Sequence, residues 1–436
     1  MTTSSQDTAV GGGPGPGTAP ADLDEFRAYT RSWAKANLEE RSEAPPGLGS
    51  TSDDELRARV AEHRAIQARL FAAGLAGIRY PAEYGGQGLS AAHQGVFIDE
   101  TGPYQMPTQL SVTLGILGPT VLDYGTEEQK RRYIPGMLSG RGIWVQLLSE
   151  PSGGSDMAGA RTRAVRDGDT YIVNGSKIWT TGAHVADFGL LLARTNPDAT
   201  KHHGLSMIVT PLDTPGVTIS PIQLATGTSD FCQEFLDDVR LPADNLLGPE
   251  NEGWPVASRL LYHERQMVGG IGLSDTRNHP APQAGESYEV IAQARQAGML
   301  GDGATRQLIG EWLTLELLYP LAAQRISAQL QLGLLPPPGA ALLKLLGGEI
   351  PYRKADLSVR VAGLSAGVWS AAEDGPGEPR QADPAGLAWL VARTSTIAGG
   401  TNEMQLNQIS ERVLGLPREA TPDKDVPFAQ IRQSGR

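Results

Sequence analysis

The sequence predicts an α+β protein of several domains, in which a helical domain is followed by a small antiparallel, barrel-like β domain and then by a helical bundle. Apolar residues recur every three or four positions before about residue 140 and again after Pro255. Between about Ile143 and Trp254 they alternate with a period of two instead. At 436 residues, the chain is also too long for a single compact core.

The N-terminal part divides into a leader and a helical domain. Residues 1–21 are rich in Gly, Pro, Ser and Thr and offer little to bury, so we expect a disordered leader. The helical domain follows over residues 22–142. Within it, the segment 126-TEEQ is typical of a helix start with a capping box, in which Thr126 and Gln129 each bond the backbone of the other.

The β domain is expected over residues 143–254. The dipeptide Asn174-Gly175 separates two short β-rich runs and therefore predicts a hairpin turn. The strands expected after it are 188-FGLLLAR, 205-LSMIVTP, 217-VTISPI and 231-FCQEFLDDVRLP.

The C-terminal part is expected to form a helical bundle over residues 255–418 and a tail over residues 419–436. A polar segment rich in turn residues, 275–290, interrupts the helical pattern. We expect this loop and the first twenty residues to be mobile and to be cut first in limited proteolysis.

Composition limits the partners and the compartment. The net charge of -12 repels polyanions, so we expect no nucleic-acid partner. A single cysteine, Cys232, excludes an internal disulfide framework. The sequence shows neither a signal peptide nor an apolar run of membrane-spanning length, and we expect a soluble, cytoplasmic protein.

Several familiar sites are absent or weakly supported. Neither a GxGxxG after a predicted strand nor a GxxxxGK[ST] occurs. His202 and His203 lack further ligands at suitable spacing, so we expect no metal site. The segment 363-GLSAG matches a nucleophile elbow after the alternating 358-SVRVA and would make Ser365 the nucleophile of a serine hydrolase. The surrounding helical pattern argues against that alternative.

One carboxylate lies within an apolar helical stripe. Glu264 shares its predicted helix face with Ala257, Leu260, Leu261, Val268 and Ile271. Burial without a partner raises the pKa of a carboxylic acid and makes its carboxylate a stronger base. The alternative is an internal ion pair with an arginine.

Two further segments would suit a ligand, although each also has a purely structural explanation. Gly399 and Gly400 precede Thr401, which is placed to cap the next helix, so the backbone there either turns sharply or is closely approached. The turn 149-SEPSGGSD and the strand 176-SKIWTTG would together suit a planar cofactor.

Six motifs in order give the chain a resemblance to a known family. They are 80-YPAEYGG, 124-YGTEEQ, 149-SEPSGGSD, 174-NGSKIWTTG, 239-VRLPADNLLG and 398-AGGTNEMQLN. Over residues 23–418 the chain resembles the acyl-CoA dehydrogenases. The resemblance implies a C-terminal four-helix bundle, an FAD cofactor, an acyl-CoA or other acyl thioester substrate and an electron-accepting flavoprotein as partner. It also implies a homo- or hetero-oligomer, either a dimer or a tetramer.

The resemblance also implies roles for individual residues. The residues expected beside the flavin ring are Gln146, Leu148, Ser149, Trp179 and Thr181. Ser155 is expected near the thioester or the flavin phosphates, and Thr401 and Glu403 along the FAD. The glycine-rich loop from Gly363 to Gly367 is expected against the flavin of a neighbouring subunit. Arg265, Gly399 and Gly400 are expected beside the substrate.

The position of the catalytic glutamate separates two branches of the family. In many relatives it occupies the position of Gly399, which excludes that branch here. In a second branch it comes from the first helix after the β domain, in a pattern like 261-LYHER. The resemblance therefore implies that Glu264 removes the α-proton while the β-hydrogen leaves as hydride to the flavin. It also implies that the two positions converge on one substrate carbon.

One family motif has no counterpart. Relatives commonly carry Arg-x-x-Phe-Gly, read across a subunit boundary onto the FAD diphosphate, where this chain has residues 275–290. Arg295 and Arg306 lie nearby in the sequence. An alternative function is therefore a non-catalytic FAD-binding subunit of a mixed acyl-CoA dehydrogenase assembly. The class of the acyl group stays open.

Overall fold

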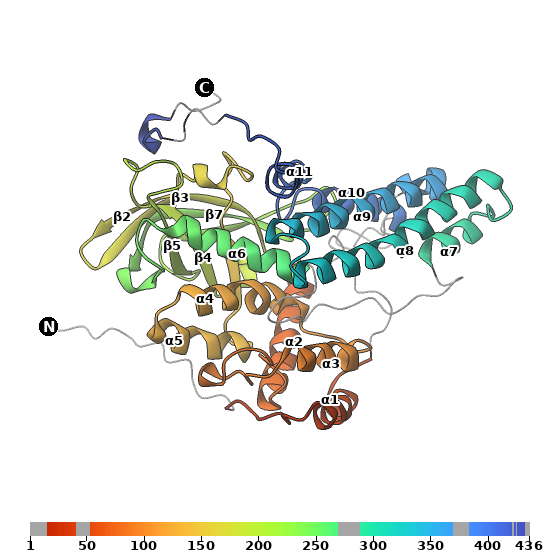
Figure 1. The fold of residues 1–436 in the computed structure, drawn as a ribbon, viewed down its shortest axis with the longest axis horizontal. Helices are drawn as coiled ribbons and strands as arrows, with labels where there is room; N and C mark the ends of the chain where they lie inside the picture. Colours follow the sequence, from red (N-terminus) through yellow and green to blue (C-terminus); the bar gives the residue numbers. More distant parts are fainter. Residues whose placement is uncertain are drawn as a thin grey trace.

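The computed structural model describes residues 15–40, 53–268, 288–368, 383–420, 423 and 425–431. Over these ranges the helical, β and helical regions follow one another in the predicted order (Figure 1). Residues 1–14 of the expected leader and 275–287 of the expected mobile loop lie outside the described residues.

The N-terminal region consists of short helices around a π-helical turn. They are α1 (Leu23–Asn37), α2 (Asp53–Ala72), α3 (Ala91–Thr101), the π-turn η3 (Thr113–Leu117), α4 (Gly118–Tyr124) and α5 (Glu127–Leu138). The predicted capping box is present at the start of α5, since Thr126 and Gln129 bond each other's backbone. The Gln129 amide also donates to the carbonyls of Asp244 and Leu246, at 2.8 and 2.9 Å, and so joins this region to the β domain.

The central region is a single sheet. Its strands are β1 (Trp144–Leu147), β2 (Arg163–Asp167), β3 (Thr170–Thr181), β4 (Phe188–Arg194), β5 (Leu205–Pro211), β6 (Val217–Ile222), β7 (Phe231–Pro242) and β8 (Leu246–Leu247). They follow the order β6-β7-β3-β2-β4-β5-β8. The pairing is antiparallel except at β4, which pairs in parallel with β1 and meets β2 in parallel at one residue pair.

The hairpin predicted at Asn174-Gly175 is wrong. Strand β3 runs through both residues, and its register against β7 shifts between Val173 and Gly175. A side chain at position 175 would meet Thr162 at 2.5 Å, so the glycine is required by a close approach within a bulge. The turn instead lies at Gly168, where φ is +60°, between β2 and β3.

The C-terminal region contains long helices. They are α6 (Gly253–Val268), α7 (Glu289–Gln296), α8 (Gly303–Gln331), α9 (Ala341–Ala362), α10 (Pro384–Ser395) and α11 (Asn402–Gln408). Helix α9 packs between α8 and α10 (Figure 1). The chain end then returns to the β domain, where the Phe428 N–H donates to the Ala199 carbonyl at 2.8 Å.

The expected strand before the apparent nucleophile elbow is also wrong. Residues 358–362 belong to α9, and Gly363–Gly367 form a 3-10 turn after it. The Ser365 hydroxyl donates to the Ala362 carbonyl at 2.9 Å. A nucleophile elbow needs a sharp turn from a strand into a helix. The local fold therefore removes the structural basis for a serine hydrolase.

Two apolar cores lie on the two sides of the sheet and position α6. On β4, Leu190 and Leu192 belong to the core shared with the N-terminal helices, whereas Leu191 and Ala193 belong to the core inside the β domain. This alternation follows from the two-residue period of a strand. Helix α6 joins the first core and lies between the sheet and α4 (Figure 1).

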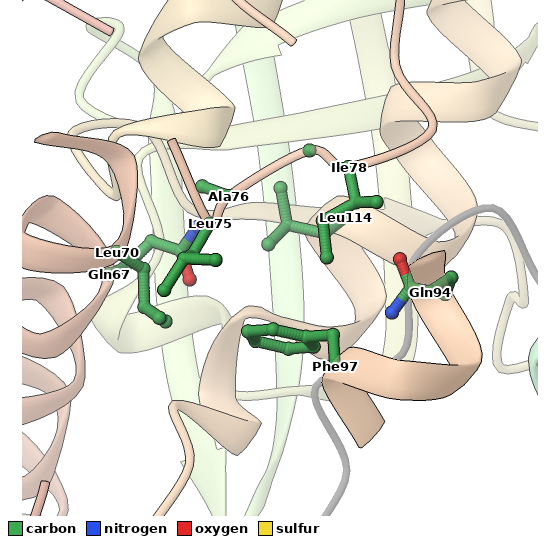
Figure 2. A pocket seen from close by; sticks show the side chains of 9 residues that line it. Gln67, Leu70, Leu75, Ala76, Ile78, Gln94, Phe97 and Leu114 are labelled. Atoms are coloured by element: carbon green, nitrogen blue, oxygen red, sulfur yellow. The ribbon is translucent and has the colours of Figure 1, made fainter. Parts of the chain in front are cut away.

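A small cavity lies in the N-terminal region between α2, α3 and the π-turn η3. Figure 2 shows it surrounded mainly by the apolar side chains of Leu70, Leu75, Ile78, Phe97 and Leu114. Its volume of about 10 Å³ is enough for roughly one water molecule. Its lining includes none of the site residues predicted above, so we treat it as a packing feature.

Candidate active site

Helix α6 brings Glu264 to the junction of the three regions. The helix starts tightly against β5, because a side chain at Gly253 would meet the Ser206 backbone at 2.6 Å. Its side chains at Val256, Ala257 and Leu260 are fully buried. Glu264 follows one turn later and is partly buried. The predicted stripe continues to Ile271, which lies outside the described residues.

A polar contact also fixes α6 against the N-terminal region. One carboxylate oxygen of Asp123, at the end of α4, accepts from Arg259 Nε at 2.5 Å. The same oxygen lies 2.8 Å from His263 Nε2. Because His263 is buried and directly precedes Glu264, this contact limits rotation of the helix that carries the carboxylate.

The surroundings of Glu264 act on its pKa in opposite directions. Burial raises the pKa, and this is the largest effect. A hydrogen bond with Gln146 and the charges of Arg265 and Lys344 lower it, and the net shift is upward. Gln146 belongs to β1, so a residue predicted beside the flavin meets the predicted base directly.

The glycine turn before α11 faces Glu264. Gly399 and Gly400 have φ values of +71° and +90°, a backbone conformation that favours glycine. A Cβ at position 399 would lie 2.9 Å from Oε1 of Glu264. The structure therefore brings together the two positions at which members of the family place a glutamate. Sequence reasoning left open whether the glycines mark a sharp turn or a close approach, and both occur.

Thr401 and Glu403 lie at the start of α11, directly after that turn. The Thr401 hydroxyl accepts from the Met404 N–H at 3.2 Å and caps the helix as predicted. Glu403 is exposed in the first turn. The Gln405 amide donates to the Gly400 carbonyl at 3.2 Å and helps to hold the turn.

The segment after β1 is held from below by a buried ion pair. Lys177 donates to the Leu148 carbonyl at 3.0 Å and to Glu150 at 2.8 Å, and its side chain is fully buried. Glu150 in turn accepts from the N–H groups of Arg161 and Thr162. Although burial alone raises the pKa of Glu150, Lys177 and these N–H groups hold it below its usual range. This network fixes the backbone at Leu148 and Ser149.

Trp179 is unusual for a strand residue. Its φ is +68° and its side chain is 56 % exposed, next to a register shift between Ile178 and Thr180. A large aromatic residue held in this conformation is strained, and strain of this kind is concentrated at functional sites. The exposed indole and the hydroxyl of the exposed Thr181 offer an aromatic edge or face and a hydrogen-bonding group to a planar ligand.

The remaining predicted residues are more scattered. Ser155 is exposed in the loop after β1, beside Asp156, which forms an ion pair with Lys201 at 2.7 Å. Gly363 and Gly367 lie at the far end of α9. At a rise of 1.5 Å per residue, Gly363 is about 29 Å along that helix from Lys344, which lies near Glu264. Within one chain the structure does not bring this loop to the other site residues.

Sequence reasoning missed Lys177, Glu150 and Lys344. Each is a charged residue in a segment whose pattern alone favours an exposed side chain, yet all three are buried. The only sequence signal was the placement of Glu150 and Lys177 within the two motifs expected to flank the flavin. Arg295 and Arg306, considered as replacements for the missing arginine, are both exposed at the ends of α7 and α8.

The residues around Trp179 fit an FAD. The exposed indole, the nearby hydroxyls of Ser149 and Thr181 and the Gln146 amide offer the stacking and hydrogen-bonding groups that a flavin ring needs. None of the helices in the described part of the chain is long and apolar enough to cross a membrane.

Family models match all three regions of the chain. The acyl-CoA dehydrogenase N-terminal domain matches residues 21–141, the middle domain residues 146–239 and the C-terminal domain residues 251–414.

Individual relatives agree with these models. The acyl-CoA dehydrogenase IpdE1 of Mycobacterium tuberculosis is 37% identical over 403 residues, which cover 92% of this chain and 99% of the relative. The acyl-CoA dehydrogenase FadE29 of the same organism is 35% identical over 373 residues, which cover 82% and 89%. A solved structure described as the Tcur3481-Tcur3483 steroid ACAD is 31% identical with a TM-score of 0.68, over 92% and 99% of the two chains. The chain therefore belongs to the acyl-CoA dehydrogenase family and is an FAD-dependent oxidoreductase.

Proposed function

We propose that Glu264 is the general base of this acyl-CoA dehydrogenase and removes the α-proton of the acyl thioester. The observation that supports the proposal is the position of its carboxylate, 2.9 Å from the point that a Cβ at residue 399 would occupy. Family members of the other branch place their glutamate at that residue. A base from either position would then reach the same substrate carbon.

The chemistry requires a base that is both ionised and strong. A thioester α-proton is weakly acidic, so its removal needs a positioned carboxylate. Burial raises the pKa of Glu264 and makes it a better proton acceptor, while Arg265 and Lys344 favour its charged form. The free backbone of the Gly399 and Gly400 turn is placed to approach the thioester closely.

When FAD is bound, it supplies the acceptor for the β-hydride. In this chain, Gln146, Leu148, Ser149, Trp179 and Thr181 would hold the ring, and the network of Lys177 and Glu150 would keep that backbone in place. Thr401 and Glu403 would lie along the cofactor at the start of α11. Gly363 and Gly367 would touch the flavin of a neighbouring subunit.

We further propose that the substrate is a CoA thioester with a steroid-derived acyl group. Support comes from the neighbour described as a steroid ACAD, at 31% identity over nearly the whole chain. A second neighbour is described as the ChsE4-ChsE5 complex of Mycobacterium tuberculosis and is 29% identical with a TM-score of 0.63 over 92% of this chain and 99% of that chain. A mixed assembly and an electron-accepting flavoprotein are therefore the partners to seek.

The test is anaerobic reduction of the reconstituted FAD protein. A steroid side-chain CoA thioester is compared with straight-chain acyl-CoAs, with and without a candidate partner chain. We expect the flavin absorbance to bleach with the steroid thioester. A chain that binds FAD but is reduced by none of the thioesters would favour the alternative, a non-catalytic subunit of a mixed assembly.

Moving the carboxylate tests whether the two positions converge. Gln at 264 would still occupy the space beside residue 399, so the better background is Glu264→Ala. Combining it with Gly399→Glu should restore part of the flavin reduction rate. The restoration will be incomplete, because the positive φ of Gly399 costs a side-chain residue roughly 1–2 kcal/mol. Equal rates for Glu264→Ala and the double variant, with both folded and loaded with FAD, would count against convergence.

A further inference from the structure

Lys344 is a buried cation beside the proposed base. It lies in the first turn of α9 and is 8% exposed, although lysine is rarely buried without a partner. Its Nζ donates to the Ser395 carbonyl at the end of α10, at 2.8 Å. That carbonyl is neutral and accounts for only one of the three donors of the ammonium.

The geometry places the lysine next to Glu264. A Cβ at Gly399 would lie 3.2 Å from Cε of Lys344 and 2.9 Å from Oε1 of Glu264. Both atoms therefore lie within 3.2 Å of one point, and the lysine and the carboxylate are neighbours across the glycine turn. Because its ammonium bonds Ser395, Lys344 acts on Glu264 through its charge across this short gap.

The two groups also influence each other's protonation. Burial lowers the pKa of Lys344 and the charge of Glu264 raises it, while the charge of Lys344 lowers the pKa of Glu264. The other charged group that acts on Glu264 is Arg265, on the same helix. On the side of α4, Asp123 faces Arg259 and His263 instead, and β1 contributes the neutral Gln146.

We propose that Lys344 is a positioning residue for the base, keeping Glu264 ionised across the glycine turn and fixing that turn through Ser395. This inference rests on the proposed role of Glu264. Lys344 touches neither reacting atom in this account, and it acts through the carboxylate and through the backbone that carries Gly399.

The first test is the pH profile of flavin reduction by an acyl-CoA that reduces the parent enzyme. Lys344→Met keeps an apolar stem of similar length and removes the charge. We expect the acidic limb to move upward by about one to three pH units, as an opposite charge at short range shifts a carboxylic acid. The rate at pH 7 should fall about tenfold or more, while the limiting rate at high pH stays near that of the parent.

Two variants serve as controls. Lys344→Arg keeps the charge and should restore the parent profile. Lys354→Met makes the same change ten residues further along α9, where the lysine pairs with Glu316 away from Glu264, and should leave the profile unchanged. A uniform loss of rate at every pH in Lys344→Met, or an unshifted limb, would overturn the inference and indicate a structural role.

A second measurement does not depend on activity. Infrared difference spectra across a pH titration report the C=O stretch of a protonated carboxylic acid, and the Glu264 band is the one missing from Glu264→Gln. We expect its midpoint to move upward in Lys344→Met and to return in Lys344→Arg. An unmoved midpoint contradicts the role of Lys344 alone. Parent-like activity in Glu264→Gln contradicts the proposed base, whatever the infrared result.

Discussion

The β domain and the C-terminal bundle bury their side chains to very different extents. Six of the seven residues of β4 are buried, whereas α8 has three buried residues among its 29. The β domain even encloses charged side chains, among them Lys177 and Glu234, both fully buried. The bundle exposes apolar ones, and five leucines on α8 and the segment after it are each more than half exposed: Leu317, Leu318, Leu321, Leu332 and Leu334.

The difference indicates which region depends on a partner chain. The β domain completes its own core and satisfies most of its buried charges internally. The bundle leaves an apolar surface of a kind that marks interaction sites. The proposed active site takes Gln146 from the first region and Lys344 from the second, with Glu264 on the helix between them. We therefore expect stability to depend on the β domain and assembly to depend on the bundle.

The largest effect on stability is expected from breaking the buried ion pair. Lys177→Met leaves Glu150 buried without its cation, which typically costs about 3–5 kcal/mol. The free energy of unfolding in urea measures this loss. Arg240→Met is the control, because Arg240 and Asp167 form a pair in which both side chains are 65% exposed, and such pairs contribute about 1 kcal/mol or less. Equal losses in the two variants would mean that the β domain does not depend on its internal charges.

A smaller effect is expected from the exposed leucines, and on assembly only. Leu317→Gln with Leu321→Gln should weaken subunit association, by roughly 1.5–3 kcal/mol for each leucine that a partner fully covers. Sedimentation velocity at a fixed protein concentration measures the change. Val165→Gln is the control, since Val165 is 46% exposed on β2 of the β domain. An unchanged assembly in the leucine variant would place the subunit interface elsewhere.

The smallest effect per unit of change concerns pH. Burial is the main cause that raises the pKa of Glu234 to about 8, from 4.5 in the unfolded chain. The folded state therefore holds this proton between these values, and the resulting stabilisation is lost as the pH rises through about 8.

Glu234→Gln should flatten this dependence and stabilise the protein more at pH 8.5 than at pH 5. The expected change in slope is on the order of 1 kcal/mol per pH unit. Thermal unfolding across this range checks it, with the exposed Glu62→Gln as the matched control. Parallel curves for Glu234→Gln and the parent would show that Glu234 titrates as an ordinary carboxylic acid.

The elements set by local pattern were predictable from the sequence. The strands expected at 188–194, 205–211, 217–222 and 231–242 have the bounds that the structure shows, because their alternation and flanking turn residues are local signals. The capping box at Thr126 depends on four residues only and is confirmed. Asn174-Gly175 failed as a turn because Thr162, twelve residues away, approaches the glycine closely.

The site was predictable only in part, for a similar physical reason. Glu264 was identified from its apolar neighbours along the helix and from the family resemblance, and its role as base stays a prediction. Its contact with Gln146 and the nearby charge of Lys344 depend on segments more than 75 residues away in the chain. No periodicity reports which buried charges face each other, so Lys177, Glu150 and Lys344 could not be found from the sequence alone.

The central claim is that Glu264 removes the α-proton. The most direct measurement is the rate of flavin reduction in a single anaerobic turnover, comparing Glu264→Gln with the parent at a saturating acyl-CoA concentration. Gln keeps the shape of the side chain and cannot accept the proton, so the rate should fall about 10²- to 10⁴-fold. The FAD content and thermal stability should stay those of the parent. A Glu264→Gln enzyme that reduces its flavin as fast as the parent would contradict the account.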